Sequence, residues 1–353
     1  MKITNVEVWQ EDYQLVEPYT IAYETFTKAP QVFVRIENNK GISGYGCASP
    51  DLFVTGETTT QIFNVLKKHG DEVLIGKDPF IINRHRYSMQ KNMKDFPGAR
   101  AAVEMALYDM LGKHCHLPVW RLLGGYRKSI KTCMTIGIKP LDETIAAVND
   151  KVKEGFLALK IKGGADVEED IEKIMKVREA VGPKIEIRFD ANQGYDVNET
   201  MHFVQATQKA NLSIIEQPVG KMRHEDLVTL TKHSEVPIMA DETLIGLMDA
   251  FKIARNGLAD MVNIKLMKCG GITEATQINA VARSAGLSAM VGCMDELALG
   301  ISAGLHFALA HRNVNIADLD SHLEIIGDPT AAAVIFRDGH LFPSAKPGFG
   351  YDP

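Results

Sequence analysis

The chain of 353 residues has few cysteines, no long apolar run and no long run of charges of one sign. Its five cysteines are scattered and odd in number, and none forms a Cys-x-x-Cys pair, so we expect reduced thiols in a cytoplasmic protein. The first residues lack the apolar core of a signal peptide, and no segment approaches the length of a membrane span, which predicts no membrane partner. The net charge of −6 is spread along the chain and argues against a nucleic-acid partner.

The first part of the chain, residues 1–125, has the pattern of an α+β domain. Strand-like segments cover Ile3 to Trp9 and Gln31 to Glu37, and the segment NNKGISGYG between them and the helices is typical of a hairpin. Apolar residues at helical spacing predict helices over 58–69, 80–93 and 98–114. With 45% hydrophobic and 24% charged residues, the chain can bury the cores of a smaller and a larger domain.

From about residue 130, short apolar runs alternate with helical patterns of ten to fifteen residues. The eight runs are TCMTIGI, FLALKIK, IEIRFD, LSIIE, VPIMA, DMVNIK, LSAMVG and NIADL. This alternation predicts parallel strands joined by crossovers, and eight of them favour a closed barrel over residues 126–322. An open doubly wound sheet is the alternative, but no GxGxxG opens a helix after the first strand. We expect residues 323–353, with one strand-like piece (AAAVIF), to return to the N-terminal domain.

Charged residues interrupt these apolar strands at their ends. Lys160 and Lys162 end the second strand, two residues apart and therefore on one face. The next four strands end in Asp190, Glu216, Asp241 and Lys265. Counted from Lys162, successive members are 24–28 residues apart, the length of one strand, one helix and two loops. They should form one layer at the C-terminal ends of the strands, where barrel enzymes place their active sites.

A single acidic residue at a strand end is more often a helix N-cap than a functional group. Charged residues in register at successive strand ends are harder to explain as caps. In addition, Asp190 and Glu216 precede Ala-Asn and Gln-Pro turns and not a helix start. We therefore interpret the layer as a site.

The chemistry of this layer suits removal of a proton beside a carboxylate. Asp190, Glu216 and Asp241 form an oxygen-only ligand set that fits a hard divalent cation, and the absence of histidine and cysteine from these positions argues against zinc. Such an ion stabilises the developing enediolate. Lys162 and Lys265, on opposite sides of a closed barrel, could remove the proton from one face and return it to the other. The ion and a second ammonium would lower the pKa of the lysine that acts as base.

Other functions for a barrel of this kind are open at this point. A Schiff-base aldolase needs one lysine and no carboxylate triad, and metal-dependent hydrolases on barrels usually draw on histidines. A non-catalytic barrel scaffold would not explain lysines buried beside carboxylates.

Five motifs carry a family resemblance: LKIK, FDAN, IIEQP, MADET and NIKLMKCGG. In this order and spacing the chain resembles the muconate-lactonising subgroup of the enolase superfamily. The resemblance implies a (β/α)7β barrel capped by an α+β domain built from both chain ends, and commonly a homo-oligomer. It further implies one Mg²⁺ per subunit on Asp190, Glu216 and Asp241. Lys162 and Lys265 resemble the two acid/base catalysts, and Lys160 the auxiliary lysine.

Within this subgroup, the eighth strand points to one activity. Asp318-Leu319-Asp320 resembles the DxD motif with which dipeptide epimerases hold the α-ammonium group of the substrate. Asp295 in the GCMDE run after strand seven and Thr135 on strand one are further candidates for substrate contact. The resemblance therefore implies a small dipeptide substrate; an acylamino-acid racemase, a succinylbenzoate synthase and a cycloisomerase are the alternatives.

In this family the side chain of the second residue meets the cap loop near residues 18–28 and the loop around 51–57. Tyr23 and Glu24 are the candidate contacts in the first loop, where only Lys28 is basic. The apolar character of this loop suggests tolerance for neutral side chains. We predict an L-Ala-D/L-Glu type epimerase with broad tolerance at the second residue, acting in murein peptide metabolism. Cys47 replaces a glutamate common in the family, and we expect it to affect only loop packing.

Overall fold

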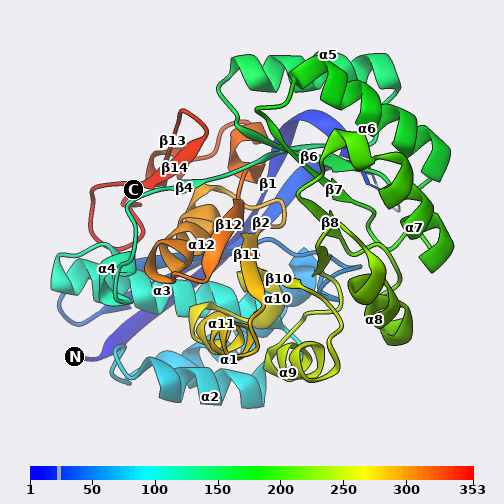
Figure 1. Cartoon of the computed structure of the whole chain (residues 1–353). Helices are drawn as coiled ribbons and strands as arrows, with labels where there is room; N and C mark the ends of the chain where they lie inside the picture. Colours follow the sequence, from blue (N-terminus) through cyan, green and yellow to red (C-terminus); the bar gives the residue numbers. More distant parts are fainter. Residues whose placement is uncertain (22–24) are drawn as a thin grey trace.

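The computed structural model describes residues 1–21 and 25–353 (Figure 1). Its centre is a parallel sheet of eight strands in the order β12-β11-β10-β9-β8-β7-β6-β5. The strands are β5 (Met134–Ile136), β6 (Ala158–Lys162), β7 (Glu186–Asp190), β8 (Ile214–Glu216), β9 (Ile238–Ala240), β10 (Met261–Lys265), β11 (Ser288–Gly292) and β12 (Val314–Asp318). A parallel bridge between Thr132 and Ala317 brings the two edges together, so the sheet is a nearly closed barrel.

Helices follow the strands and cover the outside of the barrel, as Figure 1 shows in green, yellow and orange. They are α5 (Leu141–Lys153), α6 (Val167–Val181), α7 (Val197–Ala206), α8 (His224–His233), α9 (Leu247–Asn256), α11 (Ile272–Ser284) and α12 (Ala298–Ala310), with a short α10 (Leu266–Cys269) directly after β10. All eight predicted strands are present with a crossover helix between each pair, which confirms the (β/α)7β barrel.

Side-chain alternation sorts the interior of the barrel into layers. One set of inward-facing residues forms a separate apolar cluster: Ile214, Met239, Met261 and Met290, with Ile316 packed against it. Two residues further along β8 and four further along β10, the inward positions are Glu216 and Lys265. Because side chains two or four residues apart on a strand point to the same side, the apolar and the charged residues both point into the barrel. The charged layer therefore lies on a layer of packed apolar side chains.

The cap contains an antiparallel sheet and three long helices. The sheet has the order β1-β2-β3, and the helices pack beside it (Figure 1, blue and cyan). The elements are β1 (Ile3–Thr20), β2 (Thr25–Asn38), β3 (Ser43–Ala48), α1 (Thr59–Leu74), α2 (Ile82–Asn92), α3 (Pro97–Cys115) and the short α4 (Val119–Leu122). A Cβ atom on Gly44 or Gly46 would lie 2.0 Å from a carbonyl oxygen of α3, so only glycine lets β3 approach this Ala-rich helix.

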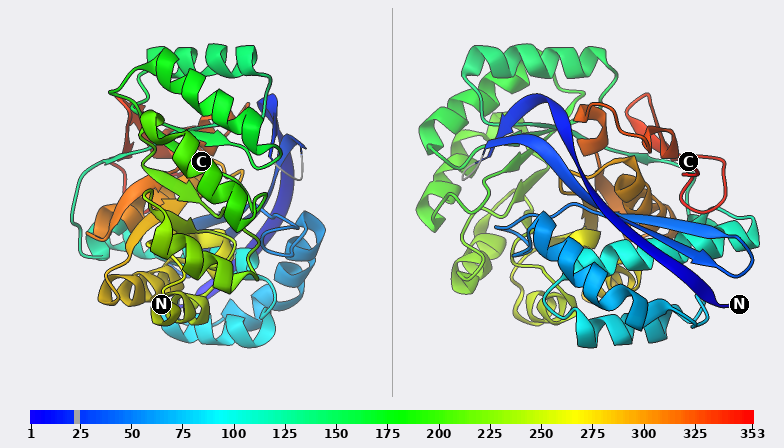
Figure 2. Two further views of the ribbon diagram at one scale, coloured as in Figure 1. Left: turned by 45° about the vertical axis from the view of Figure 1, so that its right-hand side comes forward. Right: turned by 180° about the vertical axis from the view of Figure 1, so that it is seen from behind.

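The first two strands are longer than the sequence predicted. Figure 2 shows β1 and β2 as a long twisted ribbon that runs from the N-terminus to the barrel. The second half of β1 and the first residues of β2 pair with each other, are largely exposed and carry many polar residues, which hides the strand pattern. The ribbon brings Tyr19 and Phe26 to the mouth of the barrel.

The C-terminal tail packs against the cap and the first barrel segment. β13 (Val334–Arg337) and β14 (His340–Pro343) form a small sheet with β4 (Ile130–Lys131). Further on, the Phe349 amide donates to Asp109 Oδ1 of α3 at 2.8 Å, and Tyr351 contacts the Tyr45 ring edge-on. These contacts agree with the predicted return of the tail.

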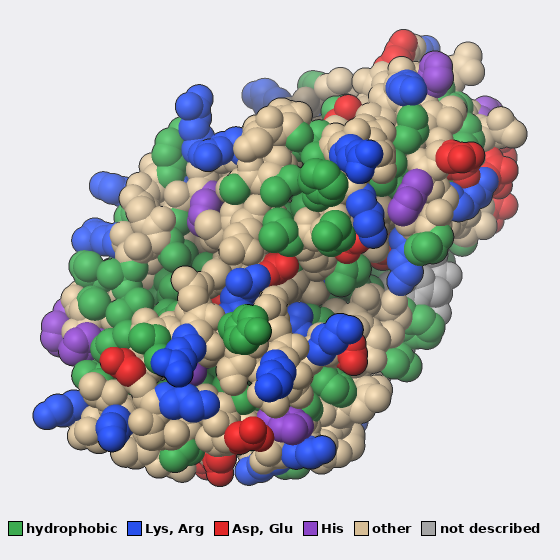
Figure 3. Space-filling view, turned by 90° about the horizontal axis from the view of Figure 1, so that it is seen from below, with side chains coloured by type: hydrophobic (Ala, Val, Ile, Leu, Met, Phe, Trp, Pro, Cys, Tyr) green, Lys and Arg blue, Asp and Glu red, His purple; other side chains and the backbone are tan. Residues whose placement is uncertain are grey.

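The surface gives no sign of a dedicated charged face in the view of Figure 3, where Lys and Arg side chains are dispersed among acidic, histidine and hydrophobic ones. Of the helices in the described part of the chain, none has the length and apolar character needed to cross a membrane.

Candidate active site

The predicted site residues of the barrel come together at the C-terminal ends of the strands, in a pocket between barrel and cap. Barrel residues on its wall include Lys160, Lys162, Asp241, Lys265 and Asp318. The cap contributes Leu15, Tyr19, Ile21, Phe26, Asp51 and Val54. Asp190 and Glu216 do not line the pocket but are fully buried against Lys160.

Each of the three predicted metal ligands contacts lysine. The Lys160 ammonium lies 3.0 Å from Asp190 Oδ2 and 2.7 Å from Glu216 Oε2. Lys162 Nζ donates to Asp190 Oδ2 at 2.7 Å. On the other side, Lys265 Nζ lies 2.9 Å from Asp241 Oδ2. The two predicted catalytic lysines thus approach different carboxylates. They come from strands β6 and β10, which are separated in the sheet by three other strands.

Amide and ammonium groups hold these carboxylates in place. Asn263 Nδ2 donates to Glu216 Oε1 at 2.7 Å, and the Asn192 amide donates to Asp190 Oδ1 at 2.9 Å. Lys268, which is 2% exposed, donates to the carboxylate and, at 2.6 Å, to the carbonyl of Asp241. Asn192, Asn263 and Lys268 were not among the predicted site residues. For Asn263 the signal was in the sequence, because it lies two residues before Lys265 on the same strand face.

The electrostatics of the layer follow from burial and from these pairs. Burial lowers the pKa of Lys160, but Asp190, Asp318 and Glu216 outweigh it, and its pKa lies well above the ordinary value. Burial also lowers the pKa of Lys265, but the charge of Asp241 outweighs it, and the pKa is raised. The carboxylates alone therefore keep Lys160 and Lys265 protonated. The predicted lowering of the pKa of the catalytic base stays a prediction, since it depends on the charge of the ion.

Glu216 shows that the cluster holds more negative charge than the lysines compensate. Burial and the neighbouring Asp190 raise the pKa of Glu216 to about 8. Close by, Glu242 is 3% exposed and its Oε2 has no hydrogen-bond partner. A buried carboxylate oxygen without a partner is costly, and an added cation would remove that cost.

The residues present fit a hard divalent cation in their chemistry. Over residues 1–21 and 25–353, no three His, Cys, Asp or Glu side chains are already arranged as a ligand shell, because ammonium groups lie between the carboxylates. The donor set of Asp190, Glu216 and Asp241 is nevertheless entirely oxygen, buried and over-supplied with negative charge. These are the properties that Mg²⁺ and similar ions require.

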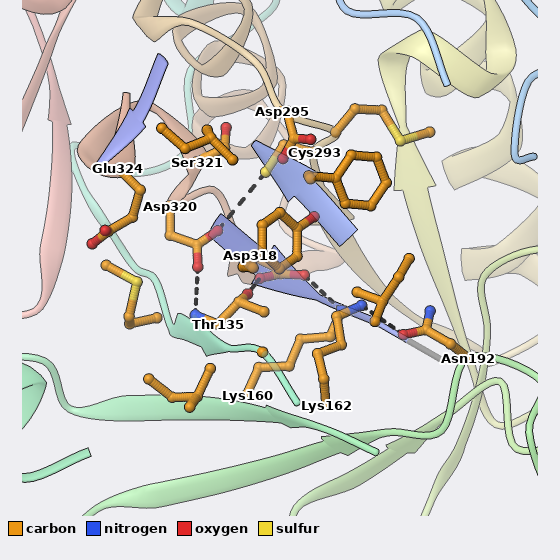
Figure 4. A pocket seen from close by; sticks show the side chains of 18 of the residues that line it. Thr135, Lys160, Lys162, Asn192, Cys293, Asp295, Asp318, Asp320, Ser321 and Glu324 are labelled. Atoms are coloured by element: carbon orange, nitrogen blue, oxygen red, sulfur yellow. Dashed lines mark hydrogen bonds and ion pairs between the residues drawn. The ribbon is translucent and has the colours of Figure 1, made fainter. Parts of the chain in front are cut away.

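The DxD pair at the end of β12 lies in the pocket beside Lys160 and Thr135 (Figure 4). Asp318 Oδ2 lies 2.9 Å from Lys160 Nζ, and its Oδ1 accepts from the Cys133 thiol at 3.1 Å and from the Thr135 hydroxyl at 3.3 Å. Asp320 Oδ2 accepts from the Thr135 amide at 2.5 Å. The Cys293 thiol approaches Asp320 Oδ1 at 3.9 Å. The predicted residue Thr135 therefore contacts both predicted aspartates, Asp318 and Asp320.

The two carboxyls of the pair differ in their ionisation. Burial opposes the charge of Asp318, but Lys160 outweighs it and the pKa of Asp318 is lowered. Burial and the charge of Asp318 together raise the pKa of Asp320 to about 6. Asp318 already has a cationic partner, whereas Asp320 accepts hydrogen bonds but forms no ion pair with any described residue. The pair can therefore accept one more positive charge from a ligand.

Asp295 links the barrel to the cap. Its backbone carbonyl accepts from Gln31 Nε2 at 2.6 Å and from Ser49 Oγ at 2.8 Å, so cap residues fix the loop after β11. Its side chain lines the pocket and is hydrogen-bonded to Tyr19. Burial and the nearby charge of Asp51 raise the pKa of Asp295 to about 7. Asp51 is a pocket residue that the sequence did not single out by itself.

Three cap predictions have different outcomes. Tyr23 and Glu24 lie outside the described residues. Lys28 forms a 3.4 Å ion pair with Asp12 on the surface and does not line the pocket. Cys47 is fully buried, and a Cβ atom on Gly300 would lie 3.4 Å from its sulfur, which agrees with a packing role.

Comparisons with known proteins cover almost the whole chain. Residues 3–124 match the family model for the N-terminal domain of mandelate racemase / muconate lactonizing enzyme, and residues 143–353 match the model described as enolase C-terminal domain-like. A hydrophobic dipeptide epimerase of Enterococcus faecalis is 38% identical over 335 residues, which are 95% of this chain and 94% of that protein. An L-Lys-D/L-Arg epimerase of Desulforapulum autotrophicum is 39% identical over 355 residues, 99% of both chains.

Solved structures agree with these matches. A substrate-liganded complex of the L-Ala-D/L-Glu epimerase from Bacillus subtilis has a TM-score of 0.96 at 35% identity, over 99% of this chain and 98% of that one. A dipeptide epimerase from Enterococcus faecalis, complexed with Mg and the dipeptide L-Leu-L-Tyr, has a TM-score of 0.96 at 37% identity over 99% of each chain. The predictions of the superfamily, of its capped barrel and of an isomerase are confirmed. This chain belongs to the mandelate racemase / muconate lactonizing enzyme family of the enolase superfamily.

Proposed function

We propose that the protein is a dipeptide epimerase, which inverts the α-carbon of the C-terminal residue of its substrate. The observation that carries this proposal is the composition of one pocket. Two lysines from β6 and β10 line it together with Asp241. Asp190 and Glu216 are buried beside it against Lys160, and a DxD pair with room for another positive charge begins at the end of β12. The lysines and carboxylates suit transfer of the α-proton, and the DxD pair suits binding of a free amino terminus.

The carboxylates Asp190, Glu216 and Asp241 would hold the cofactor, Mg²⁺, in agreement with the magnesium found in a solved relative. When bound, the ion neutralises negative charge that develops on the substrate carboxylate during proton removal. Lys162 and Lys265 act on opposite faces of the α-carbon: one removes the proton, and the other delivers a proton to the other face. Lys160 contributes a further positive charge between the carboxylates and the DxD pair.

Asp318 and Asp320 select substrates with an α-ammonium group. A charge-assisted hydrogen bond to a carboxylate is about twice as strong as a neutral one, and a buried unpaired carboxylate is costly. An N-acyl amino acid or a muconate would leave Asp320 without a cationic partner. A dipeptide therefore suits this pair better than the substrates of acylamino-acid racemases, succinylbenzoate synthases and cycloisomerases.

The cap side of the pocket favours a neutral or cationic second side chain. Leu15, Ile21, Phe26 and Val54 supply apolar surface, and Asp51 and Asp295 supply negative charge. The two lysines on this side are engaged, Lys139 with Glu17 and Lys151 with Glu324. Within the broad range of L-Ala-X dipeptides predicted from the sequence, we therefore expect a preference for apolar or basic X over glutamate. The role in murein peptide metabolism, the cytoplasmic location and the homo-oligomer stay predictions from the sequence.

A panel of paired substrates tests the proposal. With Mg²⁺ present, we expect L-Ala-L-Leu, L-Ala-L-Lys and L-Ala-L-Glu each to give the L,D diastereomer, with glutamate the slowest, and their N-acetylated forms to give none. Asp51→Asn should reduce kcat/KM for L-Ala-L-Lys and leave that for L-Ala-L-Leu within about twofold. Equal turnover of free and N-acetylated substrates would contradict the role of the DxD pair.

A further inference from the structure

Lys160 occupies a position that sets it apart from the other lysines of the site. Its ammonium lies within 3.0 Å of three carboxylate oxygens, which belong to Asp190, Glu216 and Asp318 on three different strands. The side chain is 2% exposed, so these charges are its environment in place of water. Lys162, by comparison, contacts one carboxylate oxygen of this group and the amide of Asn192.

Two of the oxygens that contact Lys160 belong to proposed metal ligands. A divalent ion held by Asp190 and Glu216 needs their electron pairs, and an ammonium at 2.7–3.0 Å from the same oxygens uses them for hydrogen bonds. The third partner, Asp318, is outside the metal set and offers Lys160 an ion pair that does not involve the ion. From a single position the Lys160 ammonium therefore contacts both the proposed metal ligands and the DxD pair, and its ion pair with Asp318 can persist without the other two.

We infer that Lys160 is the internal counter-cation of the carboxylate cluster and competes with the divalent ion for Asp190 and Glu216. Buried carboxylates at this spacing need a positive charge to stay ionised. Lys160 supplies it, and loading of the ion shifts its ammonium onto Asp318 alone. This inference rests on the proposed function in one respect, the assignment of Asp190 and Glu216 as metal ligands.

Removal of the competing ammonium should tighten metal binding. Isothermal titration of Mg²⁺ into wild-type enzyme, Lys160→Met and Lys162→Met tests this without substrate. We expect the dissociation constant to fall at least tenfold in Lys160→Met. The matched control Lys162→Met loses one carboxylate contact and not three, so its dissociation constant for Mg²⁺ should change less than threefold. An unchanged or weaker affinity in Lys160→Met would overturn the inference, as would equal tightening in both variants.

The inference can also be tested on the wild-type chain, in case Lys160→Met does not fold. Crystal structures of the wild type with Mg²⁺ and with EDTA should differ at Lys160. With Mg²⁺ its Nζ should lie beyond hydrogen-bond distance of Asp190 and Glu216 and within it of Asp318; persistent contacts with all three would refute the exchange. Magnesium binding elsewhere, or none, would overturn the metal assignment and the inference together. If Lys160 competes with Mg²⁺ as expected but the wild-type enzyme has no epimerase activity, the proposed function alone is refuted.

Discussion

Asp320 offers a substitution that should stabilise the protein and damage its activity at the same time. The pKa of Asp320 is raised to about 6 from an ordinary value of 3.8, because the carboxyl is buried and faces the charge of Asp318. The native state therefore binds more protons at this group than the unfolded state between about pH 4 and pH 6. Stability falls as the pH rises through that window, and above it the cost of the buried charge is constant.

The size of this cost follows from the shift. Two pH units correspond to about 3 kcal/mol at 1.36 kcal/mol per unit, and coupling to Asp318 makes about 1–3 kcal/mol a fair range. Asp320→Asn removes the charge and keeps an oxygen that can accept from the Thr135 amide. At roughly 2 °C or less per kcal/mol for a chain of this length, the melting temperature at pH 8 should rise by about 2–5 °C. At pH 4.5 the gain should largely disappear.

Asp318→Asn is the matched control, with the opposite sign. The pKa of Asp318 is lowered because burial is outweighed by the Lys160 ammonium 2.9 Å away, so its charge stabilises the native state. Differential scanning calorimetry at both pH values should show a lower melting temperature for Asp318→Asn at pH 8. Both variants should lose roughly 10- to 100-fold in kcat/KM for dipeptides, the value of one hydrogen bond to a charged group. A destabilised Asp320→Asn at pH 8, or a gain that does not depend on pH, would refute the reasoning.

Three further predictions concern the lysines, the metal and the cap. Lys162→Ala and Lys265→Ala should each abolish α-proton exchange from a different diastereomer, and NMR in deuterated water checks this; retained exchange in both would contradict the two-base mechanism. EDTA should remove epimerase activity and added Mg²⁺ restore it, so activity in excess chelator would argue against the cofactor. Gly271→Ala should lower the free energy of unfolding in urea by about 2–4 kcal/mol, because Gly271 has a φ of +121° and an added Cβ would lie 2.1 Å from Glu104 Oε2 of the cap helix α3. Gly257→Ala, which has open space around it, should lower it by about 1 kcal/mol.

The barrel and its charged layer could be predicted because short local sequence patterns indicate both. Most strands are apolar runs of a few residues, and a charged residue ends β6, β7, β8, β10 and β12. The period of two then places Asp190, Glu216 and Lys265 on the inner face without any long-range information. Asp318 and Asp320 also follow the apolar run of the eighth strand, but their role in substrate binding came from the family resemblance.

The contacts that complete the site are long-range, and local patterns do not contain them. Lys268 reaches Asp241 only because α10 turns the chain directly after β10. Asp51 and Asp295 come from the cap and from the barrel, and their proximity depends on how the two parts dock. The long β1–β2 ribbon was missed for a related reason: its outer half has one solvated face, so its polar residues look like a loop.

The measurement that tests the account most directly is proton NMR of the enzyme with Mg²⁺ and L-Ala-L-Leu in deuterated water. We expect loss of the leucyl α-proton signal, unchanged alanyl α-proton intensity, and growth of the L-Ala-D-Leu diastereomer. Stable α-proton signals across L-Ala-L-Leu, L-Ala-L-Lys and L-Ala-L-Glu, with magnesium bound, would contradict a dipeptide epimerase.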